Sequence, residues 1–158
     1  MYTAVQMVRQ ALAHHGGHAD IVELPDPAPT AAAAALQLGC EVGAIANSVV
    51  FSVDGAPLLV VVSGAHRVDT RRVAELRGVA HRRIRRADPD FVLRVTGQRV
   101  GGVAPVGHPS PLPTLLDERL GDYPHVWAGA GLPHTVFRTT CADLVRLTGA
   151  APVAVGAD

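Results

Sequence analysis

A loop rich in glycine and proline, GGVAPVGH at residues 101–108, has the residue types best suited to chemistry. Glycine lets the backbone come close to a ligand and exposes its N–H groups. Such groups together can form a concavity that binds a carbonyl or phosphate oxygen. The loop has neither the Gly-Lys-Ser/Thr of a Walker loop nor a dinucleotide fingerprint. On residue chemistry alone, a surface connection between two elements remains the simpler reading.

A second candidate is a polar residue inside an apolar strand, IANSVVF at residues 45–51. Alternation places Ile45, Asn47, Val49 and Phe51 on one face of this strand. Burying an amide there without a partner costs roughly 2 kcal/mol or more. We therefore expect Asn47 either to face a ligand pocket or to bond a neighbouring backbone group.

Positive charge forms a third candidate site. The net charge is zero, yet all 14 basic residues are arginine. Eight of them lie in residues 67–86, where Asp69 and Glu75 are the only acids, so this segment carries an excess of six positive charges. Phosphate binding needs clustered charge and little sequence context. The segment, called the arginine segment below, is either a nucleic-acid contact or a solvated face.

The remaining reactive side chains give weaker patterns. His14, His15 and His18 are interrupted by glycines and lack the His-Glu-x-x-His spacing of a zinc helix. We expect a frayed helix end there and no metal site. Cys40 and Cys141 stand far apart in apolar surroundings and are expected to be buried thiols. The Gly-x-Ser-x-Gly of a serine hydrolase is absent from the sequence.

Hydrophobic periodicity and turn residues predict the elements that position these candidates. Asp54-Gly55 is a strong signal for a hairpin between two strands. Thr30, Asp69 and Thr140 are expected helix caps, and Asp88-Pro89 should open a further helix. The expected helices span residues 4–15, 30–39, 69–78, 88–97 and 140–149, and the expected strands lie within residues 19–25, 44–53, 57–64, 81–86, 114–120, 125–131 and 134–139. This mixture favours one α+β domain over residues 1–158.

Composition limits the classes of protein further. Hydrophobic residues make up 48% of the 158 residues, which is enough to build a packed core. No apolar run approaches the roughly 20 residues that cross a bilayer. The N-terminal segment lacks the basic start and apolar block of a signal peptide. We expect a cytoplasmic protein without a membrane partner.

Read together, the segments resemble the YbaK/ProX family of aminoacyl-tRNA deacylases, which is related to the editing insertion domain of bacterial prolyl-tRNA synthetases. The ordered segments that carry the resemblance are TAAAAALQLGC, AIANSVVF, PLLVVVSGAHRVD, TGQRVGGVAPVGH, TLLDERL, WAGAG and HTVFRTTCADLVRLTG. They extend from Thr30 to Leu147. The resemblance implies a single domain with a mixed, mostly antiparallel sheet. It also implies trans-editing, the hydrolysis of the ester that joins a wrong amino acid to a tRNA.

One residue departs from the family pattern. The family's strand usually reads Lys-Ser-Leu-Val-Phe, and Asn47 stands here at the lysine position. An amide donates and accepts hydrogen bonds but carries no charge. Two functions therefore stay open, an active deacylase and a catalytically silent tRNA-binding module of the same fold. A third alternative, a small-molecule hydrolase or binding protein, would leave the arginine segment without a role.

The resemblance and the residue chemistry together give an expected site. Asn47 and Gly101 are the expected catalytic residues, with backbone N–H groups of residues 101–104 stabilising an oxyanion. The expected substrate-binding residues are Ser48, Val49, Phe51, Gly102, Val103, Ala104, Pro105, Gly107 and His134. The expected tRNA-binding residues are Arg67, Arg71, Arg82, Arg83, Arg85 and Arg86. No cofactor is expected. Aminoacyl-tRNA is the expected partner, and a synthetase partner, the oligomeric state and the amino acid stay open.

Overall fold

A computed structural model of the chain describes residues 3–16 and 20–158. Its centre is a mixed sheet of eight strands in the order β1-β8-β7-β2-β3-β6-β9, with β5 added beside β2. The strands are β1 Ile21–Glu23, β2 Ile45–Val53, β3 Ala56–Ser63, β5 Ile84–Arg86, β6 Thr114–Asp117, β7 Val126–Gly129, β8 Thr135–Thr139 and β9 Pro152–Val153. A separate pair joins β4 Arg67–Val68 to β10 Gly156–Ala157. The helices are α1 Ala4–His14, α2 Ala31–Leu38, α3 Thr70–Arg77, α4 Pro89–Thr96 and α5 Cys141–Thr148.

Strand β2 is the element on which the rest of the sheet is arranged. One edge pairs with β3 along nearly its whole length, in an antiparallel hairpin closed at Asp54-Gly55. The other edge has two partners, β7 in parallel at Ile45 and Ala46, and β5 in antiparallel from Phe51 to Val53. Antiparallel pairs outnumber parallel ones in the molecule, which confirms the predicted α+β class with a mixed sheet.

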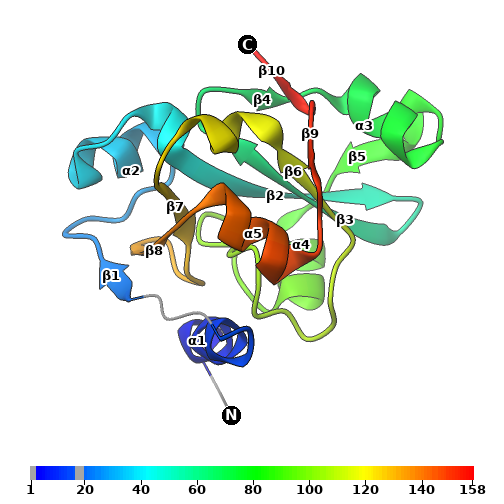
Figure 1. Ribbon diagram of the computed structural model, residues 1–158. Coiled ribbons are helices and arrows are strands. Elements are labelled where there is room, and N and C mark those ends of the chain that lie inside the picture. Colours follow the sequence, from blue (N-terminus) through cyan, green and yellow to red (C-terminus); the bar gives the residue numbers. More distant parts are fainter. Residues whose placement is uncertain (1–2, 17–19) are drawn as a thin grey trace.

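Helices cover both faces of the sheet (Figure 1). The larger core lies between one face and helices α1, α4 and α5, and takes Ala46 and Val50 from β2. On the opposite face, α2 packs on Ile45, while α3 packs in the cluster that contains Val49 and Phe51. Figure 1 shows α2 near one end of β2 and α3 toward the other. A stretch of β2 between the two helices is therefore left uncovered.

The predicted helix caps are present. Thr30, Asp69, Asp88 and Thr140 each accept a hydrogen bond from a backbone N–H in the first turn of the helix that follows, as N-cap residues do. The predicted strand at residues 81–86 is shorter than expected, because its first half is a 3-10 turn, His81–Arg83. Strands β4, β9 and β10 were not predicted, since each has only two residues and too little pattern to detect.

Candidate functional site

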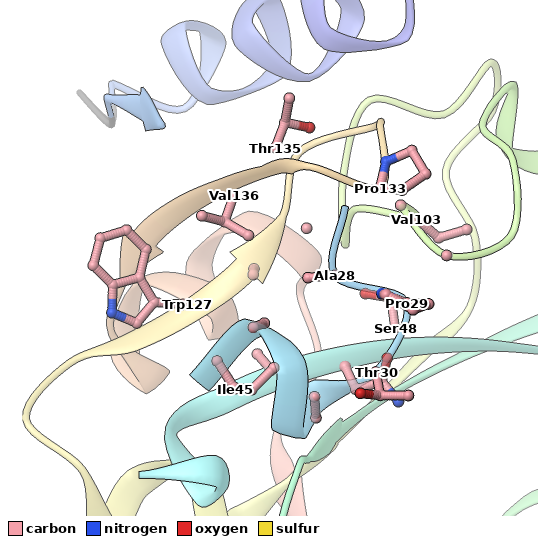
Figure 2. Close-up of a pocket in the computed structure, with 18 residues that line it drawn as sticks. Ala28, Pro29, Thr30, Ile45, Ser48, Val103, Trp127, Pro133, Thr135 and Val136 are labelled. Carbon is pink, nitrogen blue, oxygen red and sulfur yellow. The ribbon is translucent and has the colours of Figure 1, made fainter. Parts of the chain in front are cut away.

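A cavity opens where the free edge of β2 lies between β7 and β5. It has a volume of about 110 Å³ and is called the edge cavity below. Figure 2 shows that its wall comes from the segment before α2, from β2, from the glycine-rich loop and from the β7–β8 connection. The lining residues are Ala28, Pro29, Thr30, Ala31, Ala34, Ile45, Ala46, Asn47, Ser48, Gly101, Gly102, Val103, Trp127, Ala128, Gly129, Pro133, Thr135 and Val136. All are uncharged at neutral pH, so the cavity itself holds no side chain that could serve as a strong base.

Asn47 lines the edge cavity and is exposed, which corrects the expectation that its amide is buried. The physical reason is the placement of the helices, because α2 covers Ile45 and α3 covers Val49 and Phe51 on the same face. The side chain of Asn47 has no hydrogen-bond partner within the described part of the chain. Its amide is therefore available to a ligand, and the reading in which it bonds a neighbouring backbone group is wrong.

The glycine-rich loop reaches the edge cavity through its first three residues, Gly101, Gly102 and Val103. Gly101 has a φ of +99°, a conformation that L side chains rarely adopt. Gly102 lies so close to the β7–β8 connection that a Cβ there would come within 2.4 Å of the carbonyl carbon of Leu132. The two glycines are thus required for different reasons, one for backbone conformation and the other for close packing.

Backbone donors of the loop differ in their availability. The amide of Gly102 donates to the carbonyl oxygen of Arg99 at 3.2 Å, and the amide of Ala104 donates to Oε1 of Gln98 at 2.6 Å. The N–H groups of Gly101 and Val103 have no hydrogen-bond acceptor in the part of the chain that the structure describes. Of the four N–H groups expected to stabilise an oxyanion, those of Gly101 and Val103 remain available in the described residues. Those of Gly102 and Ala104 are used in the hydrogen bonds that hold the loop in place.

The buried side chain of Gln98 holds the glycine-rich loop in place. Its side chain is 1% exposed, and its Nε2 donates to the carbonyl oxygen of Val106 at 3.1 Å while its Oε1 accepts from Ala104. His108 adds a third bond, from Nε2 to the carbonyl oxygen of Ala104 at 2.9 Å. Burial lowers the pKa of His108, an effect that its bond to Ala104 opposes, so the ring stays neutral at neutral pH and serves as a donor. Neither residue was predicted from the sequence as a support for the site.

Several expected substrate contacts lie elsewhere. Val49 and Phe51 are buried in the core beneath α3, and Ala104 is fully buried, so none of the three reaches the edge cavity. Pro105 and Gly107 line a separate groove against α1. None of the five lines the edge cavity, because the loop turns away from it after Val103 and because Val49 and Phe51 pass under α3.

His134 also lies outside the lining of the edge cavity, although its neighbours Pro133 and Thr135 belong to it. Its carbonyl oxygen accepts the amide of Leu24 and so joins the β8 end to β1. The expectation that its side chain forms a wall is wrong. Thr30 was predicted only as a helix cap, and it brings the N-terminus of α2 into the cavity wall, where a helix dipole is positive.

The arginine segment is exposed along all eight of its arginines. Arg72 pairs with Glu75 at 3.0 Å, and Arg83 pairs with Asp54. The arginines without an acidic partner in the described residues are Arg67, Arg71, Arg77, Arg82, Arg85 and Arg86. The segment ends beside the C-terminal end of β2, where Arg86 is paired with Phe51 on the face that Asn47 shares.

A metal site is not formed by the described residues, which contain no group of three or more potential ligands. His18 and Gly17, part of the histidine-rich segment, lie outside the described residues. Cys40 and Cys141 are partly buried free thiols, and burial raises the pKa of both. None of the helices in residues 3–16 and 20–158 has the length and apolar character needed to cross a bilayer.

A family of known proteins shares this fold. Residues 25–147 match the aminoacyl-tRNA editing domain, and the chain therefore belongs to that family. The match includes β2, the glycine-rich loop and every residue that lines the edge cavity. The predicted family resemblance is confirmed.

Individual relatives agree with this assignment. A solved structure of a candidate trans-editing enzyme for prolyl-tRNA synthetase is 41% identical, with a TM-score of 0.91 over 100% of this chain and 99% of that one. The crystal structure of hypothetical protein APE2540 is 27% identical, with a TM-score of 0.87 over 96% of this chain and 99% of that one. The uncharacterized protein YwhH of Bacillus subtilis (strain 168) is 27% identical over 79% of this chain and 78% of its own.

Proposed function

We propose that the protein is a trans-editing deacylase, which hydrolyses the ester between a small amino acid and the terminal ribose of a mischarged tRNA in the cytoplasm. The observation that carries the proposal is that Asn47, Gly101 and Val103 line one cavity, and that the Asn47 side chain and the N–H groups of Gly101 and Val103 have no partner in the described residues. Membership of the editing-domain family and the similarity to a candidate trans-editing enzyme support the same activity.

Hydrolysis of an aminoacyl ester requires few catalytic groups. Water adds to the ester carbonyl carbon, and the carbonyl oxygen becomes negatively charged. The amides of Gly101 and Val103 stabilise that charge through backbone dipoles that are already oriented. The carbon–oxygen bond to the ribose then breaks, and the leaving ribose oxygen takes up a proton, which yields the free amino acid and the tRNA.

Proton transfer in this mechanism relies on the substrate. The lining of the edge cavity contains no Asp, Glu, His, Lys or Cys side chain that could remove a proton from water. The ribose hydroxyl next to the ester is the polar group that the substrate itself brings to the reaction. Asn47, whose amide both donates and accepts, holds that hydroxyl or the ester in line for attack.

The size of the edge cavity favours small amino acids. A volume of about 110 Å³ lies below the roughly 300–1,000 Å³ of typical ligand pockets. The carboxyl carbon, amino group and side chain of a small residue fill such a space, whereas a large aliphatic or aromatic side chain exceeds it unless lining residues move. Cavity walls of a well-packed protein resist such a shift.

A catalytically silent tRNA-binding module is the second candidate, because Asn47 replaces the lysine that related proteins usually carry. A panel of tRNAs charged with different amino acids separates the two functions. An active deacylase releases the amino acid from at least one small aminoacyl ester faster than the spontaneous rate. The silent module instead binds aminoacyl-tRNA and leaves every ester intact.

We propose that the arginine segment supplies the main tRNA-binding face. Replacing Arg82 and Arg86 by Gln should weaken tRNA binding and lower the slope of log K against log salt by about 2, if each contacts one phosphate. Replacing Arg9 and Arg138, two exposed arginines outside the segment, removes the same charge and should leave the slope nearly unchanged. If the two double variants have equal effects, the arginine segment is a solvated face and not the main tRNA-binding face.

A further inference from the structure

Ser48 occupies the one stretch of β2 whose outer edge has no neighbouring strand. Pairing with β7 stops at Ala46, and pairing with β5 begins at Phe51, preceded by a hydrogen bond from the amide of Ala87 to the carbonyl oxygen of Val50. Backbone groups alternate between the two edges of a strand. The carbonyl of Ile45 accepts from Gly64 on the β3 edge, so the amide and carbonyl of Ser48 point to the opposite, open edge.

The side chain of Ser48 is also without a partner. Its Oγ is buried and is the one such side-chain atom in the described residues that makes no hydrogen bond. Leaving a buried hydroxyl unpaired costs about 1–3 kcal/mol, so native structures rarely keep one without a reason. Ser48 lines the edge cavity, as Figure 2 shows, so a ligand there contacts this residue and satisfies the hydroxyl once the side chain rotates about χ1 toward it.

The unpaired groups of Ser48 define what the ligand must offer. The carbonyl oxygen is an acceptor, the hydroxyl can accept or donate, and the amide at the same edge is a donor. The cavity contains no carboxylate. The hydroxyl of Thr30 is engaged by the amide of Ala33 at 3.1 Å, and the carbonyl of Gly102 is engaged by the amide of Gly131 at 2.8 Å. Ser48 therefore offers two acceptors on one residue to a small donor with more than one N–H, next to the free amide oxygen of Asn47.

We propose that Ser48 binds the α-amino group of the aminoacyl ester through its carbonyl oxygen and its Oγ, and thereby makes the site selective for amino acids over other esters. This inference rests on the proposed function, because the α-amino group is the donor that an aminoacyl ester carries next to its carbonyl. The amides of Gly101 and Val103 remain for the carbonyl oxygen, so the amine and the oxyanion have separate partners.

The test uses two stable analogues of the tRNA end, in which an amide replaces the ester. One is 3′-alanylamino-3′-deoxyadenosine, and the other is its lactyl counterpart, which has a hydroxyl in place of the amine. Calorimetry or NMR titration measures the binding of each to the parent and to Ser48→Ala. We expect the parent to prefer the alanyl analogue by roughly 10-fold or more, since hydrogen bonds to charged groups contribute about 1.5–3 kcal/mol.

Ser48→Ala should lose most of that preference while its binding of the lactyl analogue stays the same. Equal weakening of both analogues, no preference in the parent, or no binding of either analogue would each overturn the proposal. Because binding needs no turnover, the result is independent of catalysis. A protein that prefers the alanyl analogue yet leaves every aminoacyl ester intact would refute the deacylase function and retain the role of Ser48.

Discussion

Replacing Gln98 by Ala should lower the free energy of unfolding by about 2–4 kcal/mol and should displace the glycine-rich loop. The side chain is 1% exposed and bonds both the amide of Ala104 and the carbonyl of Val106. Truncation leaves both groups buried without partners, and each such group costs about 1–3 kcal/mol. Urea denaturation measures the loss, and ester hydrolysis should fall with it because the donors of the loop lose their fixed position.

A matched control for this variant exists on the surface. Gln37 makes the same pair of bonds with one backbone residue, accepting from the amide of Asp26 at 3.1 Å and donating to its carbonyl at 3.0 Å. Water can replace both bonds there, so Gln37→Ala should cost less than about 1 kcal/mol. If the two variants lose the same stability, Gln98 does not clamp the loop.

Replacing Gly102 by Ala should reduce hydrolysis on the order of 100-fold. The added Cβ would come within 2.4 Å of the Leu132 carbonyl carbon and 2.7 Å of the Pro133 nitrogen. Both atoms are backbone, so the loop itself must move away from the edge cavity. A displacement of about 1 Å at a catalytic group costs rates of this size, and overpacking costs about 1–3 kcal/mol of stability.

Gly121→Ala is the control, because a Cβ at that position meets only the sulfur of Cys141 at an ordinary 3.9 Å. It should keep both the melting temperature and the rate of the parent. Single-turnover kinetics on one small aminoacyl ester compares the three proteins. A Gly102→Ala protein with parental rates would show that close packing of the loop on Leu132 does not set the geometry of the donors.

Local signals predicted most elements of the fold. Asp54 and Gly55 both have positive φ, as a two-residue type I′ hairpin turn requires, and the sequence Asp-Gly is the usual solution. Helix caps were equally predictable, because Thr and Asp are strongly preferred at the N-cap position, where their side chains accept a hydrogen bond from the first turn. These features depend on residues within one turn of each other, and therefore need no knowledge of the tertiary structure.

The candidate site could be predicted only in part. Alternation along β2 correctly set Asn47 on the same face as Val49 and Phe51, yet it did not show that α2 and α3 would leave Asn47 uncovered between them. Likewise the glycine motif identified the loop, whereas its turn after Val103 depends on the clamp by Gln98. Both outcomes come from contacts between segments far apart in the sequence.

Asn47 explains how an editing-domain fold can keep a polar cavity without a lysine. The amide is exposed to the cavity and free of protein partners in the described residues, so binding a ligand through it would break no hydrogen bond of the protein. The first turn of α2, which also lines the cavity, adds the positive end of a helix dipole. In the proposed function, the site polarises an ester through amides and dipoles.

Single-turnover hydrolysis of alanyl-tRNA and phenylalanyl-tRNA by the parent protein is the most direct test of the central claim. The edge cavity of about 110 Å³, with donors at Gly101 and Val103, predicts release of alanine well above the spontaneous rate and little release of phenylalanine. Spontaneous decay of the alanyl ester in saturating protein, or equal hydrolysis of the two esters, would contradict it.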